Sequence, residues 1–211
     1  LDFNHPVNKV NNSKKELTYN KRSVMFHLFK NESKRYFKST IYVLNTIIGA
    51  FFILLSSALM TGFGKERIES IITMYLPNVD NLLAHINAII VMIVSVTSST
   101  VITTSASISI EGKHFWILKA HPIDVKDIFK AKMLLNILLG GIPSVIGAIL
   151  LVFVVGISYF PFAVILMLSS VVFSAIIGLI FNLKYYNLDW KDEQEIVKQG
   201  MAVLISMAVA I

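Results

Sequence analysis

The residues that could do acid–base or metal chemistry are few, and the charged ones among them lie outside the long apolar stretches of this chain. Its 211 residues include 13 acidic side chains and 5 histidines, and they include no cysteine. The sequence contains neither a zinc-binding HExxH helix nor a glycine-rich phosphate loop followed by lysine. We interpret His85, with Asn87 two residues later, as an interfacial polar residue. The sequence therefore predicts no catalytic site, metal site or disulfide framework in this chain.

Serine and threonine are concentrated in one stretch, residues 95–109, where ten of fifteen residues carry a hydroxyl. Small hydroxyl side chains let membrane helices approach closely and hydrogen-bond to one another. They occupy more than one helical face, so we expect this helix to be surrounded by protein or to border a polar cavity. Two interpretations stay open, close packing and the lining of a translocation path. Either would involve Ser95, Ser98, Ser99 and Thr103.

The elements that carry these residues follow from where charge is missing. The chain is 55% hydrophobic and only 15% charged, whereas soluble domains are about 25% charged. A membrane-crossing helix needs about 20 apolar residues. Four stretches lack Asp, Glu, Lys and Arg: residues 39–64, 81–110, 133–183 and 200–211.

The lengths of these stretches predict an all-α fold, a polytopic transmembrane helical bundle. The third stretch is long enough for two spans, and Ser158 to Pro161 is the natural turn because proline cannot continue a helix. The fourth stretch is too short for a complete span, so we expect four complete spans plus the start of a fifth, in a piece of a longer chain. The expected spans are about residues 41–60, 83–108, 133–157, 162–183 and 201–211, the last truncated.

The segment before the first span divides into two parts. Residues 1–20 are polar and aperiodic, and we interpret them as a linker that precedes a membrane domain of residues 21–211. Residues 24–38 interleave aromatic and aliphatic side chains with lysine and arginine. This pattern predicts an N-terminal amphipathic helix in the membrane interface, with a solvated helix as the alternative.

The placement of the basic residues predicts the orientation in the membrane. The chain has 19 lysines and arginines, and alternate connectors hold 17 and 2 of them. The positive-inside rule then puts the N-terminal segment and residues 111–132 and 184–199 in the cytosol. Because this membrane pattern accounts for the net charge of +6, we do not infer a nucleic-acid partner.

The connector at residues 111–132 is unusually apolar for a cytosolic loop. Phe115 and Trp116 begin an apolar run between Lys113 and Lys119, and Asp124 is a candidate N-cap for the helix that leads into the third span. Such a loop needs a surface to pack against, either a partner protein or the membrane interface. The predicted spans contain no titratable path for protons. If the protein transports, we expect its energy to come from a separate ATPase that presses on this loop.

Three segments together resemble a known family: residues 32–45 (ESKRYFKSTIYVLN), 107–119 (SISIEGKHFWILK) and 189–199 (DWKDEQEIVKQ). They are similar, in order, to segments of bacterial ATP-binding-cassette exporter permeases of the second type, in particular a group of large permeases found mainly in Firmicutes. The resemblance extends from about residue 21 to the end of the chain.

The resemblance implies a permease in the bacterial cytoplasmic membrane, with six spans per membrane half and a coupling helix after the second span. It implies that a cytosolic subunit binds and hydrolyses ATP, so that the partners are this subunit, membrane lipid and the rest of the permease. Two alternatives stay open, a non-transporting membrane scaffold or sensor and a membrane enzyme whose active site lies outside this segment. In or beside the coupling segment the resemblance places Glu111, Gly112, Lys113, Phe115, Trp116 and Leu118.

Overall fold

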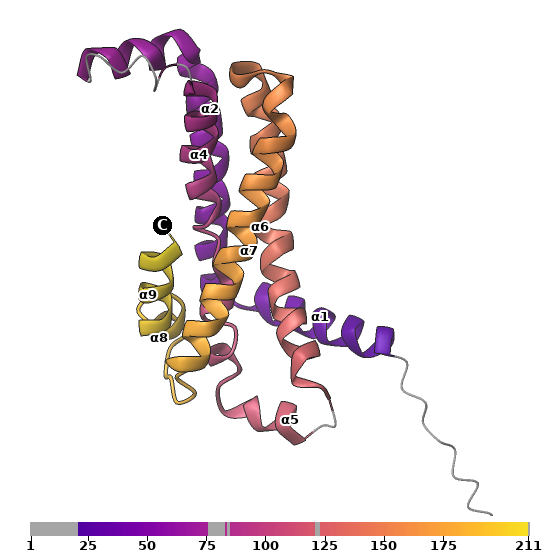
Figure 1. The fold of residues 1–211 in the computed structure, drawn as a ribbon. Helices are drawn as coiled ribbons and strands as arrows, with labels where there is room; N and C mark the ends of the chain where they lie inside the picture. The colour runs from indigo at the N-terminus through magenta and orange to yellow at the C-terminus, as the bar shows by residue number, and fades with distance from the viewer. Residues whose placement is uncertain (1–20, 76–82, 84, 121–122, 211) are drawn as a thin grey trace, which may run out of the picture.

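The computed structural model describes residues 21–75, 83, 85–120 and 123–210, and the side chains of all of these except 21–23 and 117–119. The predicted linker at residues 1–20 lies outside this range. The described residues form helices and no strand (Figure 1). Among them, four largely helical segments are long and apolar enough to cross a membrane: Thr40–Tyr75, Ile86–His114, Val125–Val155 and Ile157–Lys184. The predicted fold class, an all-α bundle with several membrane spans, is confirmed.

Helix α1 (Lys21–Lys38) lies across one end of the bundle (Figure 1). It packs against α6 and contacts the start of α2. Tyr36 is buried in this contact, whereas Phe26 and Phe37 on the same helix are exposed. An amphipathic helix that is to lie in a membrane surface needs this crosswise position.

Helix α2 (Thr40–Tyr75) is longer than the expected first span. The prediction of a loop directly after residue 60 is wrong, because the chain stays helical as far as Tyr75. The helix bends at Gly64, whose φ of 72° and ψ of 158° are not helical, in a conformation that glycine adopts far more readily than other residues. Residues 65–75, here called the α2 arm, turn away from the bundle axis at the end opposite α1 (Figure 1).

The second predicted span, about residues 83–108, coincides with the candidate span Ile86–His114, but this segment is not the single continuous helix that was expected. Helix α4 (Ile86–Ser98) ends early, and irregular chain then leads into the short 3-10 helices η1 (Thr103–Ser105) and η2 (Ser109–His114). Two hydroxyl side chains bond backbone carbonyls where α4 ends. The Ser99 hydroxyl lies 2.7 Å from the carbonyl of Val96, and the Thr100 hydroxyl donates to that of Thr97, also at 2.7 Å. Bonds of this kind also occur inside continuous helix, as from Ser57 to Ile53 in α2, so they do not by themselves end α4.

Helices α6 (Val125–Val155) and α7 (Phe160–Lys184) form an antiparallel hairpin. The predicted turn is confirmed, with Gly156 at φ 84° followed by η3 (Ile157–Tyr159) and by Pro161 in the first turn of α7. The predicted cap is also confirmed, since the Asp124 side chain accepts from the backbone N–H of Lys126 at 2.9 Å. Helix α6 continues through Pro143 without interruption.

The central packing depends on close approach between helices. A Cβ atom on Gly147 of α6 would lie 2.6 Å from the hydroxyl of Ser57 on α2, and one on Gly140 would lie 2.9 Å from Val171 on α7. Real Cβ atoms do not approach so closely, so these contacts require glycine. Around them the bundle buries an apolar core that includes Ile53, Ile90, Leu151 and Met167.

Two short helices complete the described chain, α8 (Glu193–Val197) and α9 (Met201–Ala210), and α9 lies beside α7. Asp192 caps α8 by accepting from the N–H of Gln194 at 3.1 Å.

Candidate functional site

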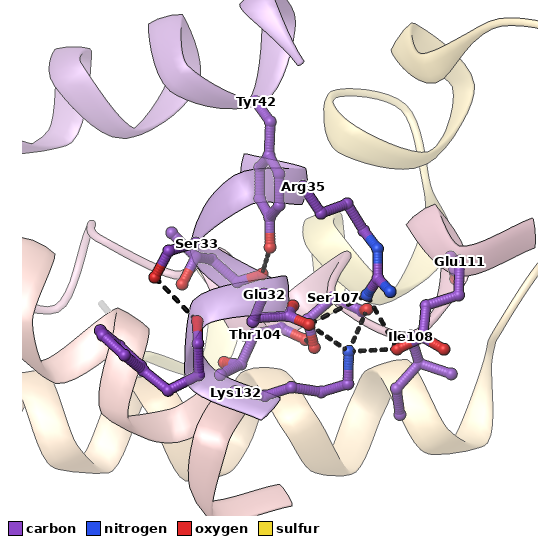
Figure 2. Close-up of polar contacts among 12 residues, drawn as sticks. Glu32, Ser33, Arg35, Tyr42, Thr104, Ser107, Ile108, Glu111 and Lys132 are labelled. Atoms are coloured by element: carbon purple, nitrogen blue, oxygen red, sulfur yellow. Dashed lines mark hydrogen bonds and ion pairs between the residues drawn. The ribbon is translucent and has the colours of Figure 1, made fainter. Parts of the chain in front are cut away.

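Four charged side chains from three separate segments meet inside the protein where α1 crosses α6 (Figure 2). Glu32 and Arg35 come from α1, Glu111 from η2 and Lys132 from α6. We call these four residues the charge cluster. Glu32, Glu111 and Lys132 are buried, and Arg35 reaches the cluster from a partly exposed position.

Lys132 is at the centre of the charge cluster, and only 2% of its side chain is exposed. Its ammonium group donates to Glu111 Oε1 at 2.5 Å, to Glu32 Oε2 at 3.0 Å and to the backbone carbonyl of Ser107 at 2.7 Å (Figure 2). These are three acceptors for the three protons that a lysine ammonium carries. A buried lysine is tolerated when it is paired and hydrogen-bonded in this way.

Arg35 completes the charge balance of the cluster. Its Nη1 atom lies 2.9 Å from Glu32 Oε2 and 3.0 Å from Glu111 Oε1. Each carboxylate therefore accepts from both cations, and the formal charge of the four side chains sums to zero. Each charge of the cluster is therefore paired with charges of the same cluster, and these ion pairs join the three segments to one another.

Local structure explains why these side chains converge. Helix α6 begins at its Asp124 cap, so Lys132 lies two turns into it, on the same buried face as Leu135. Glu32 and Arg35 are three residues apart on α1 and so share a face. Lys132 was counted among the basic residues of the connector at residues 111–132, within the helix expected to begin after the Asp124 N-cap. That helix is confirmed, but the burial of the Lys132 side chain was not predicted, and no pattern in the sequence indicates it.

A second set of contacts holds the chain directly after Glu111. Gly112 has φ 54° and ψ −138°, a conformation that residues with a Cβ rarely adopt. The indole of Trp190 packs against it, and a Cβ at Gly112 would lie 3.2 Å from Trp190 Nε1. The same indole N–H donates to the carbonyl of Ser109 at 2.7 Å. The connection between α7 and α8 thus supports the turn that leads into α5.

The break after α4 exposes backbone polar groups, and two buried asparagines satisfy some of them. Asn136 Oδ1 of α6 accepts from the N–H of Thr103 at 2.6 Å and from its hydroxyl at 2.9 Å. Asn182 Oδ1 of α7 accepts from the N–H of Ile108 at 2.7 Å. Tyr42 of α2 donates its hydroxyl to the carbonyl of Thr103. Non-helical backbone at membrane depth requires such partners, because no water is present to replace them.

The four hydroxyl residues singled out from the sequence are all buried. Ser95 donates to the carbonyl of Val91 at 2.7 Å, and the Ser99 hydroxyl lies 2.7 Å from the carbonyl oxygens of Val96 and Ala210, to either of which it can donate. Thr103 bonds Asn136, whereas the Ser98 hydroxyl is buried with no hydrogen-bond partner. The structure therefore places these residues within packed protein.

The residues of the predicted coupling segment divide into an inward and an outward group. Glu111 and Gly112 are buried, whereas Lys113 is exposed and 65% of Trp116 is exposed. Phe115 and Trp116 begin helix α5 (Phe115–Ala120), which lies beyond the end of the bundle on the same side as α1 (Figure 1). The side chain of Leu118 lies outside the described residues.

Tyr36, on α1 next to the charge cluster, shows the electrostatic effect of this packing. Its ring meets that of Tyr42 edge to face, with centroids 5.3 Å apart. Burial raises the pKa of the Tyr36 phenol, and a side-chain hydrogen bond with Thr46 partly offsets the rise. The phenol therefore stays neutral through the physiological pH range.

Comparison with known proteins identifies a family. The family model described as "Membrane protein of 12 TMs" matches residues 68–210, which is more than half of the chain. No curated protein matches the sequence. No solved structure matches it either. With its apolar helices and this match, the chain belongs to the family of membrane proteins of 12 TMs.

Proposed function

We propose that this chain is part of the permease subunit of an ATP-binding-cassette exporter in a bacterial cytoplasmic membrane. The permease moves its substrate with energy from ATP that a separate cytosolic subunit binds and hydrolyses, and it has no catalytic site of its own. One observation carries the proposal. Helix α5 presents an exposed tryptophan beyond the end of the bundle while the residues just before it are tied into the bundle through buried charges.

The exposed side of α5 has the chemistry of a protein-docking site. Tryptophan is enriched among the residues that dominate binding energy at protein interfaces, and Trp116 is 65% exposed. Exposed Lys113 lies close by in the sequence. The positive-inside distribution of lysine and arginine favours the cytosolic side for this end of the bundle. An ATP-hydrolysing subunit would approach from that side.

The charge cluster gives such a docking site a mechanical connection to the spans. Glu111 lies four residues before the start of α5 and bonds Lys132 on α6 and Arg35 on α1. A displacement of α5 would therefore pull on a membrane span and on the crosswise helix together. A flexible loop would absorb the same displacement without moving either helix.

The positions of the titratable residues also favour an outside source of energy. Lys132, Glu32 and Glu111 lie together near the end of the bundle. Beyond Lys132, α6 contains no charged residue as far as Val155. Proton-driven transporters use chains of titratable groups along their path, and α6 offers no such chain. This pattern supports energy input through α5.

The test replaces Trp116 with glutamate in the whole protein, reconstituted in lipid nanodiscs with the ATP-binding subunit that copurifies with it. Losing a docking residue of this kind costs about 2 kcal/mol or more, so we expect binding at least about 30-fold weaker and little stimulation of ATP hydrolysis by the permease. Trp116→Phe is the matched control, because it keeps a large apolar ring, and it should retain most of the stimulation. Unchanged binding and stimulation in Trp116→Glu would contradict the proposal.

A further inference from the structure

We propose that the bend between α2 and its arm binds a membrane phospholipid, with the headgroup phosphate at Lys65 and Arg67 and an acyl chain against Phe63 and Phe153. A hollow of about 400 Å³ lies at this bend. Its walls come from both sides of Gly64 and from the end of α6, where Phe153 and Val154 face it. This volume is within the range that holds small ligands in proteins. It suits a headgroup whose acyl chains continue along the protein surface.

The depth of the bend in a membrane follows from the length of α2. Residues 40–64 of this helix span about 37 Å at 1.5 Å per residue, and the hydrocarbon core of a bilayer is about 30 Å thick. Helix α1 lies across one end of the bundle and the α2 arm bends away at the other (Figure 1). With α1 at one membrane surface, the bend at Gly64 lies in the headgroup layer of the opposite leaflet.

The side chains at the hollow match a phospholipid. Lys65 and Arg67 are exposed cations, and arginine in particular binds phosphate oxygens with its planar fork. Lys65 lies 3.7 Å from Glu69 in a partly exposed pair, an arrangement that contributes little binding energy and leaves the lysine available. Glu66 also lines the hollow and suits the ammonium group of a headgroup such as ethanolamine. Phe153 is 79% exposed next to these polar groups.

The α2 arm has the residue pattern of a helix in a membrane surface. Its apolar residues follow the spacing i, i+3, i+4 and i+7 of one helical face. On an ideal helix Lys65 and Arg67 border this apolar face, from where their stems can run along lipid while their charges reach the phosphates. Glu66 and Ser70 lie on the opposite side. The apolar face consists of Ile68, Ile71, Ile72 and Tyr75.

The burial of the side chains along the α2 arm agrees with a helix that lies in the membrane surface. Ile68 and Ile72 pack against the apolar core of the bundle. Ile71, Met74 and Tyr75 are exposed, although they are large and apolar. If the arm lies in a membrane surface, lipid covers these exposed apolar side chains and no protein partner is needed. The proposal concerns the end of the bundle away from α5, so it is independent of the proposed exporter function.

The first experiment maps lipid contacts in the whole protein. Nanodiscs of phosphatidylethanolamine and phosphatidylglycerol are doped with a phospholipid that carries a photoreactive group on its acyl chain, and adducts are located by mass spectrometry. We expect adducts at Phe63 and Phe153, with a yield at least about 5-fold lower in the double variant Lys65→Gln and Arg67→Gln. The matched control is Lys126→Gln with Lys130→Gln on α6, which should leave the yield unchanged.

Two outcomes of this experiment would overturn the lipid site. One is an adduct yield at the bend that the double variant leaves unchanged. The other is competition by soluble glycerol phosphate, since displacement by the free anion would show that the acyl chain contributes nothing to binding.

The second experiment tests the arm itself through single-cysteine labels. The chain has no cysteine, so a polarity-sensitive fluorophore can be placed at Ile71→Cys and, as the matched control, at Ser70→Cys on the polar side, with any cysteine elsewhere in the protein replaced by serine. Both positions are exposed, so neither change disturbs the core. We expect brominated lipid to quench the label at position 71 and aqueous iodide to quench the label at position 70. Equal quenching of both by iodide would overturn the proposal.

Discussion

Lys132 on α6 and Glu111 in η2 form a buried ion pair, with 2.5 Å between Nζ and Oε1 and 2% of each side chain exposed. The pair fixes the middle of the α4–α6 connection to a membrane span. Breaking one side of a buried pair leaves an uncompensated charge in a medium of low dielectric constant. The attachment of this connection therefore depends on both residues, and each can be tested separately.

Replacing Lys132 with methionine should destabilise the protein by about 3–5 kcal/mol, because two buried carboxylates would then share only Arg35. The measurement is the thermal unfolding midpoint of the purified protein in detergent. A matched double variant, Lys132→Met with Glu111→Gln, removes a charge of each sign. It should recover part of the lost stability, as expected for directly coupled residues. Additive losses from the two changes would contradict the pairing.

Asn136 bonds the non-helical segment after α4, so its replacement should lower the stability of the protein. Asn136→Leu leaves the N–H and the hydroxyl of Thr103 without their acceptor, and each buried unsatisfied group costs about 1–3 kcal/mol. We expect a loss of that order in the same unfolding assay. The matched control is Asn31→Leu on α1, where the asparagine is exposed, and it should have little effect. Similar losses from both variants would argue against a specific role for Asn136.

Gly112→Ala should disturb the turn into α5. Alanine at φ 54° and ψ −138° is strained by about 1–3 kcal/mol, and its Cβ would press on Trp190. We expect faster protease cleavage near α5 and a change in tryptophan fluorescence. Gly62→Ala is the matched control, because a Cβ there meets nothing within 4 Å in the helical part of α2. If the cleavage rates of the two variants were the same, the proposed lock between Gly112 and Trp190 would be wrong.

Gly178 should tolerate no side chain, because a Cβ there would overlap the Thr104 hydroxyl and lie 2.5 Å from Ile102. Overpacking of this kind costs about 1–3 kcal/mol, so Gly178→Ala should lower the unfolding midpoint by several degrees. In the control variant Gly141→Ala on α6, the added Cβ meets only Leu168, at 3.4 Å. This variant should change the unfolding midpoint little. A Gly178→Ala protein as stable as the wild type would show that α7 does not pack closely against η1.

The spans could be predicted because hydropathy is summed over many residues. The uncharged stretch at residues 133–183 required two crossings, and Pro161 marked the turn between them. The helix limits were less predictable. Hydropathy cannot reveal that α4 ends at Ser98, because the backbone of Thr103 beyond the break is bonded by Asn136 and Tyr42, which are distant in sequence. The bend at Gly64 was also missed, because glycine occurs inside membrane helices as well as at their ends.

The charge cluster could not be predicted because its members are far apart in sequence. Glu32 and Lys132 are 100 residues apart, and burial of a lysine is normally unfavourable, so Lys132 was counted only as a basic residue of the connector at residues 111–132. The resemblance did single out Glu111 and Gly112, but only as residues in or beside the coupling segment. The structure places both inside and leaves Trp116 exposed. Only the three-dimensional contacts distinguish the anchoring residues from the exposed ones.

The central claim, that an ATP-hydrolysing subunit docks on α5, is tested most directly by photo-crosslinking from position 116. The whole protein would carry a photoreactive phenylalanine analogue in place of Trp116, with the same analogue in place of exposed Met74 on the α2 arm as the matched control. After irradiation of native membranes, adducts would be identified by mass spectrometry. The account predicts a nucleotide-binding protein crosslinked from position 116 and absent from position 74. Adducts from position 116 that contain only lipid, or no nucleotide-binding protein, would contradict it.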